Sequence, residues 1–170
     1  MAESADPQIL DLAARLTAAD AAARLDAAER LARAGAAAAA ATLPLVLACG
    51  DADEGVRDQA VAALEDLGPP PPDAIPSLVE QVANPDPLVA YWAITLLGRS
   101  GEAAAAAVTS LTQQLGAAPD PAVRQRAAWA LGRIGPAARQ ASEALRTAAT
   151  SEDPRLARLA EEALAALSSR

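Results

Sequence analysis

The stretch that decides the fold is residues 120–135, which read DPAVRQRAAWALGRIG. Val123, Ala127, Ala130, Leu131 and Ile134 lie at offsets of 0, 4, 7, 8 and 11. These offsets place one apolar stripe on an α-helix. Asp120 can cap the helix by accepting from free backbone N–H groups, and Pro121 suits the first helical position because its missing N–H costs nothing there. Gly135 suits the left-handed backbone conformation that often ends an α-helix. This stretch therefore predicts one amphipathic α-helix with a signal at each end.

The same pattern recurs along the chain at a period of about 33 residues. The capping aspartates are Asp20, Asp53, Asp86, Asp120 and Asp153, with spacings of 33, 33, 34 and 33. The first four units close with Gly35, Gly68, Gly101 and Gly135. Self-similarity at a fixed period of this length is typical of repeat proteins, whose units stack on their neighbours.

A second helix follows the Gly of each unit. Its apolar triplets are Thr42, Leu45 and Cys49; Ile75, Leu78 and Val82; Val108, Leu111 and Leu115; and Ser142, Leu145 and Ala149. Extrapolating back from Asp20 predicts a further triplet at Ile9, Leu12 and Leu16, so the chain begins with an unpaired second helix. The alanine runs at 36–41 and 103–107 fall at the starts of second helices and favour helix.

We therefore expect a single domain over residues 1–170. Its predicted parts are an N-terminal capping helix at 6–19, repeats at 20–52, 53–85, 86–119 and 120–152, and a C-terminal capping helix at 153–167. In that last helix Glu161 and Glu162 replace Ala128 and Trp129 of the preceding unit. Charge at these positions suits the solvent-facing end of a repeat array.

The unit pattern Asp-Pro-x-Val-Arg-x-x-Ala-x-x-Ala-Leu-x-x-Ile-Gly resembles the short HEAT repeats, including those of the phycobilisome-lyase type. The resemblance implies an all-α, armadillo-like fold: a right-handed α-solenoid of about five two-helix repeats, with about ten helices. It also implies a structural ladder between adjacent repeats, made by the cap Asp and the Arg four residues later. The residues in these roles are Asp20 and Arg24, Asp53 and Arg57, and Asp120 and Arg124.

The composition agrees with an all-α fold. Hydrophobic residues make up 52 % of the chain and aromatic residues 2 %, with no Phe. A core of Leu, Ala and Val requires elements that approach closely, as helices with small side chains do.

The charge makes nucleic acid a poor candidate partner. The net charge is −8, whereas a phosphate backbone requires a basic footprint. The charge is also uneven, because residues 1–85 carry 14 Asp and Glu against 5 Arg, and residues 86–170 carry 8 against 9. This asymmetry fits a solvated acidic surface or a polarised binding surface.

The chain offers little for chemistry, since it has no His, no Lys and one cysteine, Cys49, on the core stripe of its helix. We expect no catalytic residue, no metal site, no cofactor and no disulfide. The first residues lack the pattern of a signal peptide, and the apolar runs fall short of a membrane span. We expect a cytoplasmic monomer that does not bind membranes.

The resemblance to HEAT repeats implies that the second helices line a concave binding face, formed by the residues opposite their core stripe. It runs from apolar, at Leu43 and Leu47, to polar. Those two leucines are either buried by neighbouring helices or an exposed anchor for a partner, and Trp129 is either an interface residue or packing against the next repeat. The candidate partner-binding residues are Leu43, Leu47, Ser77, Glu80, Thr109, Gln113, Trp129, Arg139 and Arg146.

The sequence thus predicts a non-catalytic scaffold or adaptor that binds another protein or a peptide. Two alternatives stay open. One is a bilin lyase or lyase-like subunit, which rests on the resemblance of the repeats alone. The other is a protein that binds small acidic ligands through the arginine-richer half, with Arg124, Arg126, Arg133, Arg139 and Arg146.

Overall fold

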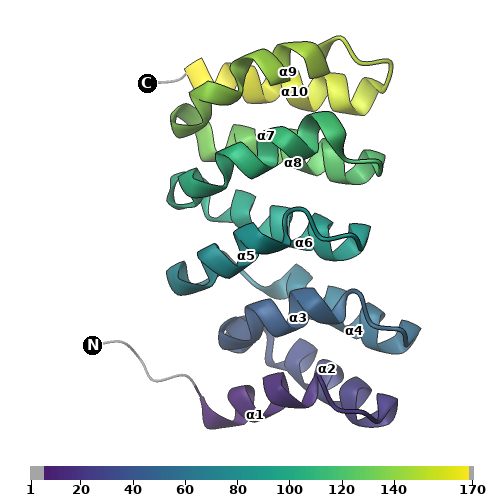
Figure 1. The fold of residues 1–170 in the computed structure, drawn as a ribbon. Coiled ribbons are helices and arrows are strands. Elements are labelled where there is room, and N and C mark those ends of the chain that lie inside the picture. The colour runs from purple at the N-terminus through teal and green to yellow at the C-terminus, as the bar shows by residue number, and fades with distance from the viewer. Residues whose placement is uncertain (1–5, 169–170) are drawn as a thin grey trace. The chain divides into compact units, whose positions relative to one another are not determined.

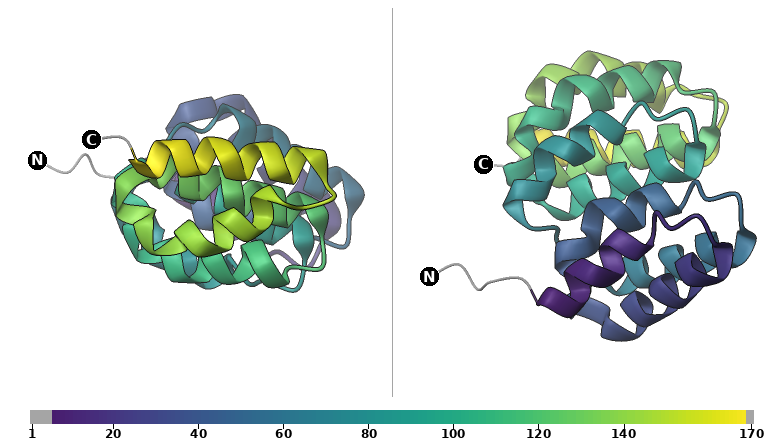
Figure 2. Two further views of the ribbon diagram at one scale, coloured as in Figure 1. Left: turned by 90° about the horizontal axis from the view of Figure 1, so that it is seen from above. Right: turned by 60° about the horizontal axis from the view of Figure 1, so that its bottom comes forward.

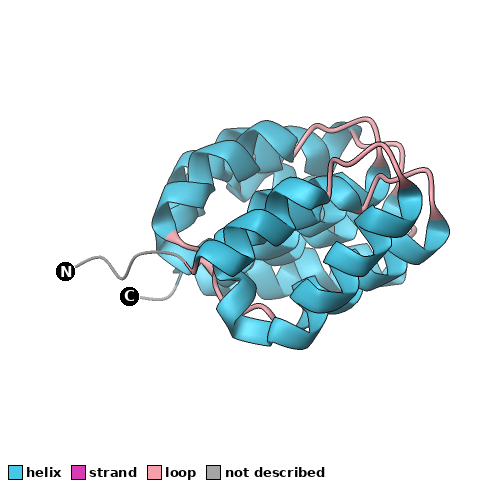
Figure 3. Ribbon diagram, turned by 90° about the horizontal axis from the view of Figure 1, so that it is seen from below, coloured by secondary structure: helices cyan, strands magenta, loops and turns pink. Residues whose placement is uncertain are grey.

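The computed structural model describes residues 6–168, and every regular element in that range is helical (Figure 3). The chain falls into two compact units, Met1–Ala74 and Ile75–Arg170. The α-helices of the first unit are α1 (Pro7–Arg15), α2 (Ala21–Ala34), α3 (Thr42–Ala48) and α4 (Glu54–Asp66). Those of the second are α5 (Ile75–Gln81), α6 (Pro87–Arg99), α7 (Val108–Ala117), α8 (Pro121–Ile134), α9 (Ser142–Ala149) and α10 (Pro154–Ser168). The predicted alternation of first and second helices is confirmed; that 1–170 forms a single domain stays a prediction.

Within each unit, first helices pack on first helices. In the first unit α2 lies beside α4 (Figure 1), and in the second unit α8 lies between α6 and α10. Each second helix packs on the first helix that follows it in the chain, as α9 does on α10 (Figure 2). The cores therefore form between neighbouring repeats, as stacked two-helix units require.

The predicted aspartate caps are confirmed at all five positions. Asp20 and Asp53 each accept from the backbone N–H three residues later, at 3.1 and 3.0 Å. Asp86, Asp120 and Asp153 each accept from two backbone N–H groups of the first turn. These bonds satisfy donors that have no partner inside the helix, which fixes where each first helix begins.

The prediction that a left-handed glycine follows each of the first four first helices is confirmed at three of four positions. Gly35, Gly101 and Gly135 have φ angles of 54°, 56° and 71°, where an L side chain is strained. Gly68 was predicted to end its helix in the same way, and this is wrong. The α4 helix ends at Asp66, Leu67 is extended with φ −69° and ψ 129°, and a run of four prolines follows. Because Leu67 is already extended, the chain leaves the helix before it reaches Gly68, and the helix end needs no left-handed residue.

Three of the second helices begin with a 3₁₀-helical segment, and two of these segments contain the alanine runs at 36–41 and 103–107. These segments are η1 (Gly35–Ala41), η3 (Gly101–Ala107) and η4 (Gly135–Ala141), and a short η2 (Pro72–Ala74) precedes α5. Their buried alanines are spaced by three: Ala38 and Ala41, Ala104 and Ala107, Ala138 and Ala141. Side chains three apart share a face in a 3₁₀-helix, so this winding keeps both alanines in the core, whereas helix propensity alone favours α.

The core is built from leucine and alanine. Leu31, Leu45 and Leu64 of the first unit are fully buried, as are many alanines. Small residues bring the helices close together. A Cβ added to Gly132 of α8 would lie 3.0 Å from the Cα of Ala163 on α10, so that position admits no larger side chain unless the helices move apart.

The arginines predicted to form a ladder between repeats all donate hydrogen bonds to backbone carbonyl groups. The Nη1 groups of Arg24, Arg57 and Arg124 donate to the two carbonyls five and six residues earlier, in the turn before the capped helix. Arg24 also reaches the turn before the next capped helix, where it pairs with Asp51 and not with the cap Asp53. The implied cap-to-arginine ladder is therefore wrong for this pair, because Asp53 uses its carboxylate on its own helix.

The helical run Ala21–Ala48 passes a length and composition test for a membrane span. It is not one continuous α-helix, because the chain turns at Gly35 with ψ −130°, and η1 and α3 follow. Leu31, Leu45 and Val46 of this run are buried inside the protein. Core helices of folded proteins pass the same test, so the finding is a weak indication of a membrane span.

Candidate functional site

Exposed leucines gather on the second helices of the first unit. Leu10 of α1 is 50 % exposed and Leu47 of α3 is 46 % exposed; within residues 6–168 no other large hydrophobic side chain is as exposed. Leu43, one turn before Leu47, is half-buried. We call Leu10, Leu43 and Leu47 the leucine surface. The sequence left open whether Leu43 and Leu47 are buried, and the structure leaves Leu47 exposed and Leu43 partly so.

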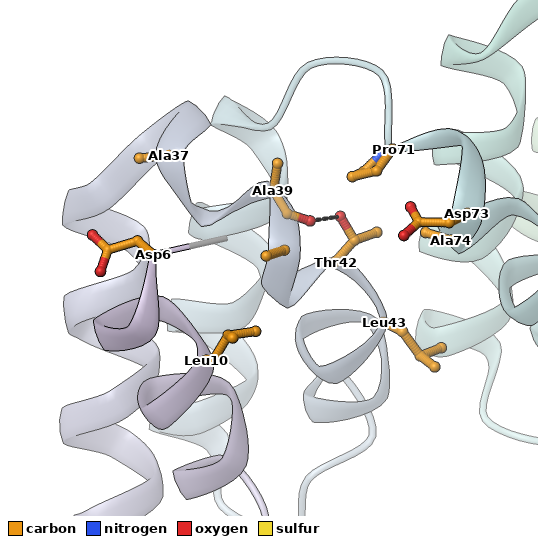
Figure 4. A pocket seen from close by; sticks show the side chains of 10 residues that line it. Asp6, Leu10, Ala37, Ala39, Thr42, Leu43, Pro71, Asp73 and Ala74 are labelled. Atoms are coloured by element: carbon orange, nitrogen blue, oxygen red, sulfur yellow. Dashed lines mark hydrogen bonds between the residues drawn. The ribbon is translucent and has the colours of Figure 1, made fainter. Parts of the chain in front are cut away.

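Two cavities meet at Leu43. The larger has a volume of about 740 Å³ and is lined by Asp6, Leu10, Leu43, Asp73 and the alanines of η1 (Figure 4). The smaller, about 210 Å³, is lined by Leu16, Leu43, Pro44, Leu47 and others. Since Leu43 borders both, the leucine surface forms a continuous apolar strip along α1 and α3.

The walls of the larger cavity carry two carboxylates. In Figure 4, Asp6 lies at one side of the labelled residues and Asp73 at the other, with Leu10 and Leu43 between them. Asp6 accepts from the backbone N–H of Gln8 at 2.8 Å, and within residues 6–168 no cation pairs with it. Asp73 is exposed and has neither a side-chain hydrogen bond nor an ion pair to any described residue. The rim of this cavity is therefore acidic.

The whole net charge of the chain belongs to the same unit. Residues 1–74 carry 13 Asp and Glu against 5 Arg, a net charge of −8, whereas residues 75–170 carry 9 of each. The leucine surface thus lies on an acidic unit, and the second unit is neutral overall. A cationic partner is attracted to the first unit and not to the second.

Six other predicted partner-binding residues lie on second helices or η4 of the second unit. Glu80 of α5, Thr109 and Gln113 of α7, Arg139 of η4 and Arg146 of α9 are exposed, and Ser77 of α5 is half-buried. Arg146 pairs with Glu143 at 3.0 Å, and the Nε of Arg139 donates to the carbonyl of Leu167 at 3.2 Å. The exposed large hydrophobic side chains of residues 6–168 are Leu10 and Leu47, both in the first unit, so the role of these six residues as a binding surface stays a prediction.

Trp129 lies on a first helix, unlike those six residues. It belongs to α8 and is half-buried, with its ring against Gly98 of α6. The interpretation as packing on the neighbouring repeat is thus confirmed, although part of the side chain remains accessible.

Arg126 stands between two aromatic rings beside Trp129. Its Cζ lies 4.4 Å from the ring centroid of Tyr91 and 5.0 Å from that of Trp129, and it donates to the Tyr91 hydroxyl. Burial, and then the charge of Arg155, lowers the pKa of the Arg126 guanidinium below its usual value. Because an arginine stays protonated far above neutral pH, this cluster is a fixed positive charge.

The arginines proposed for acidic ligands are not brought together as a set. Arg124 is engaged with the carbonyls of Ala118 and Pro119, and Arg139 and Arg146 have the contacts given above. Arg133 is exposed and lies near the end of α8. Arg126 borders a cavity of about 170 Å³.

Residues 6–168 contain no group of three His, Cys, Asp or Glu side chains placed to hold a metal ion. Cys49 is fully buried, and its Sγ lies 3.5 Å from the carbonyl oxygen of Leu45, as expected for a core thiol. The sequence missed Asp6, Asp73 and Tyr91 as site residues. The first two are separated by 67 positions, so only the fold brings them to one cavity. Leu10 had a sequence signal, since it lies on the solvent side of the first amphipathic helix.

Comparison with solved structures finds the same fold elsewhere. An engineered protein superposes with a TM-score of 0.65 at 25 % identity, over 95 % of this chain and 80 % of that one. A designed armadillo repeat protein in complex with a (KR)4 peptide gives 0.65 at 19 % identity, over 92 % and 80 %. The complex of CpcE and CpcF of phycocyanin lyase from Nostoc sp. PCC7120 gives 0.65 at 24 % identity, over 100 % and 69 %. A comparison with curated proteins gave no match.

A family model for HEAT repeats matches residues 44–111 and 75–165. These matches cover most of the chain and fall on the helices whose caps and apolar stripes define the 33-residue period. The chain therefore belongs to the HEAT repeat family.

Proposed function

We propose that this protein is a non-catalytic scaffold that binds a segment of another protein on the leucine surface of its first unit. The observation that carries the proposal is the placement of the two exposed leucines at cavities that meet at Leu43. Leu10 lines the cavity of about 740 Å³, and Leu47 lines the cavity of about 210 Å³. Exposed apolar side chains grouped at a cavity are typical of interaction sites, because leaving them in water is unfavourable.

The chemistry of the partner follows from the rim. Asp6 and Asp73 border the apolar strip and lack cationic partners among the described residues. The partner we propose is a segment with two or three apolar anchor side chains flanked by Lys or Arg. Its anchors cover the leucines, and its cations approach the two carboxylates, which speeds association and sets the orientation of the segment.

The repeat fold supports the proposal. A designed armadillo repeat protein of the same fold holds a peptide, so a stack of such helices is able to present a peptide-binding surface. A cytoplasmic monomer is part of the proposal. A bilin lyase activity finds its support only in the likeness to the CpcE–CpcF complex, which extends to the fold, and no feature of the leucine surface favours it.

The test uses two 14-residue amphipathic peptides of defined composition, one of Leu and Lys and one of Leu and Glu, labelled for fluorescence anisotropy. The Leu/Lys peptide is expected to bind the wild-type protein saturably and the Leu/Glu peptide to bind at least about tenfold more weakly. The affinity for the Leu/Lys peptide is expected to fall as salt is raised, because exposed charges are screened.

The Leu10→Glu, Leu47→Glu double variant separates apolar contact from charge. It makes the unit more acidic, so electrostatic attraction alone predicts tighter binding of the Leu/Lys peptide, whereas loss of the apolar anchors predicts binding weaker by about tenfold or more. The matched control is Ala22→Glu, an added carboxylate at an exposed position of α2 in the same unit. Equal or tighter binding by the double variant, with helicity unchanged by circular dichroism, rejects the leucine surface as the site.

A further inference from the structure

A third cavity lies on the first helices of the second unit and shares no residue with the leucine surface. It has a volume of about 170 Å³ and is bordered by α6, α8 and α10. Its walls include the two arginines Arg126 and Arg155, the rings of Tyr91 and Trp129, and the apolar side chain of Leu159. Two positive charges thus face one small, partly apolar space.

Neither arginine is neutralised by a side chain. Within residues 6–168 no carboxylate lies in salt-bridge distance of Arg126 or Arg155, whereas six other arginines make such pairs. The nearest acidic residue in sequence, Asp153, is already engaged: it accepts from the Nε2 of Gln125 at 2.7 Å and caps α10. Two unpaired like charges repel each other, and an anion between them would remove that repulsion.

Arg126 is also held in place before any ligand arrives. Tyr91 and Trp129 contact its guanidinium from two sides, at 4.4 and 5.0 Å from the ring centroids, and Tyr91 accepts one of its hydrogen bonds. The other N–H groups of a guanidinium are a planar fork that matches two oxygens of one oxyanion. An ordered fork loses little side-chain entropy on binding, which favours recognition of an anion at this point.

We propose that the cavity formed by Arg126, Arg155, Tyr91 and Trp129 binds a phosphate monoester group. A phosphate monoester carries close to two negative charges at neutral pH, so it neutralises both guanidinium groups at once, which a carboxylate does not. The rings of Tyr91 and Trp129 and the side chain of Leu159 provide an apolar wall for the carbon atoms next to the ester oxygen. The cavity has room for the phosphate group and its nearest carbons, so the rest of the ligand extends into solvent.

Two sources share this chemistry, a small phosphate ester and a phosphorylated side chain of another protein. Three probes separate them: phenyl phosphate, a seven-residue phosphoserine peptide, and the same peptide without phosphate. Each is titrated at constant ionic strength into the full chain, with tryptophan fluorescence and isothermal calorimetry as readouts. Since Trp129 borders the cavity, occupancy is expected to change its emission.

The variants are chosen so that each removes one positive charge. Arg126→Gln and Arg155→Gln remove a charge from the cavity, and each is expected to weaken phosphate binding by about tenfold or more. Arg133→Gln is the matched control, because Arg133 is an exposed residue of α8 that does not border the cavity. It is expected to change the affinity by less than about twofold.

The outcomes decide as follows. Saturable binding of phenyl phosphate or the phosphopeptide, lost in both cavity variants and kept in Arg133→Gln, supports the site, and the tighter of the two ligands indicates the source. Absence of saturable binding by both phosphate compounds overturns the proposal. So does equal weakening in Arg133→Gln, which would mean general attraction to a charged surface, or binding of the unphosphorylated peptide as tight as that of the phosphopeptide. Because Arg155 is exposed, Arg155→Gln keeps the test valid even where Arg126→Gln disturbs folding.

Discussion

The ring of Trp129 on α8 occupies the place where a side chain at Gly98 on α6 would begin. A Cβ added to Gly98 would first meet Cζ3 of that ring, and would lie 2.9 Å from Cε3 and 3.0 Å from Cη2. Gly98 lies within the last turn of α6 (Pro87–Arg99), where glycine is less favourable than alanine. Its role is to let the indole of the next repeat lie directly on the α6 backbone.

The Gly98→Ala variant is expected to lower the free energy of unfolding by about 1–3 kcal/mol, because the ring must move or the helices separate. In a Trp129→Ala background the same substitution is expected to be neutral or to stabilise by up to about 1 kcal/mol, since alanine favours helix. Urea unfolding of the four proteins gives the coupling directly. Additive effects of the two substitutions would show that the ring does not depend on Gly98.

The left-handed turns can be tested with two glycines. Gly135 has φ 71° and ψ −139° and nothing near its missing Cβ, so Gly135→Ala is expected to cost about 1–3 kcal/mol from backbone strain alone. Gly68 also has open space, but its φ is not positive, so Gly68→Ala is expected to be neutral or to stabilise by up to about 1 kcal/mol. Thermal unfolding followed by circular dichroism checks both, and a similar loss in both variants contradicts the difference between the two helix ends.

The Arg24–Asp51 pair predicts a specific dependence on pH. The two side chains are 16 % and 10 % exposed, and two N–H groups of Arg24 donate to the carboxylate at 2.7 and 2.9 Å. This hydrogen bonding to Arg24 lowers the pKa of Asp51 below its usual value. A carboxyl with a lowered pKa in the folded state stabilises the protein fully above its unfolded pKa of about 3.9, and this stabilisation is lost as the pH falls through the lower, folded pKa.

Wild type and Asp51→Asn are therefore expected to differ in unfolding midpoint between pH 5 and 7, with the variant less stable. That difference is expected to shrink as the pH is lowered below about 4. Asp58→Asn is the control, because Asp58 is exposed and has no ion pair among the described residues. A constant difference between wild type and Asp51→Asn down to strongly acidic pH would show that the pair does not depend on the charge of Asp51.

The stacked core predicts a strong contrast between an internal and a terminal position. Leu97 of α6 is fully buried, and Leu97→Asp is expected to cost more than about 4 kcal/mol and to abolish the cooperative transition. Glu162 of α10 is exposed and pairs with Arg158, and Glu162→Ala is expected to change stability by less than about 0.5 kcal/mol. Differential scanning calorimetry compares them, and similar behaviour of the two variants would mean that the assignment of core and surface is wrong.

The parts of the fold predicted correctly are those fixed by local chemistry. Asp86 and Asp120 bind N–H groups two and three residues away, so their caps follow from the sequence alone. The 3₁₀ winding of η1 does not follow from the sequence alone, because alanine propensity favours an α-helix. The helices packed around Ala38 and Ala41 decide that these two alanines, three residues apart, are both buried. The prediction of a left-handed helix end at Gly68 is wrong, because α4 ends at Asp66 and Leu67 is already extended.

The candidate sites depend more strongly on contacts between distant residues. Helical periodicity placed Leu47 opposite the core stripe of its helix but left open whether neighbouring helices bury it, and in the structure it is exposed. Helical periodicity does not predict that Asp73 borders the same cavity as Leu10. It also does not predict that Arg24 pairs with Asp51 and not with the cap Asp53. These contacts depend on the distances between packed helices, and the sequence pattern of one repeat carries no information about those distances.

The most direct test of the central claim is a map of bound peptide on the isotopically labelled protein. The amphipathic Leu/Lys peptide is titrated in and the backbone amide chemical shifts are followed by nuclear magnetic resonance. The account predicts that the largest shifts fall on α1, η1 and α3, around Leu10, Leu43 and Leu47. Largest shifts on α2 and α4, or on the helices after Ile75, would contradict it.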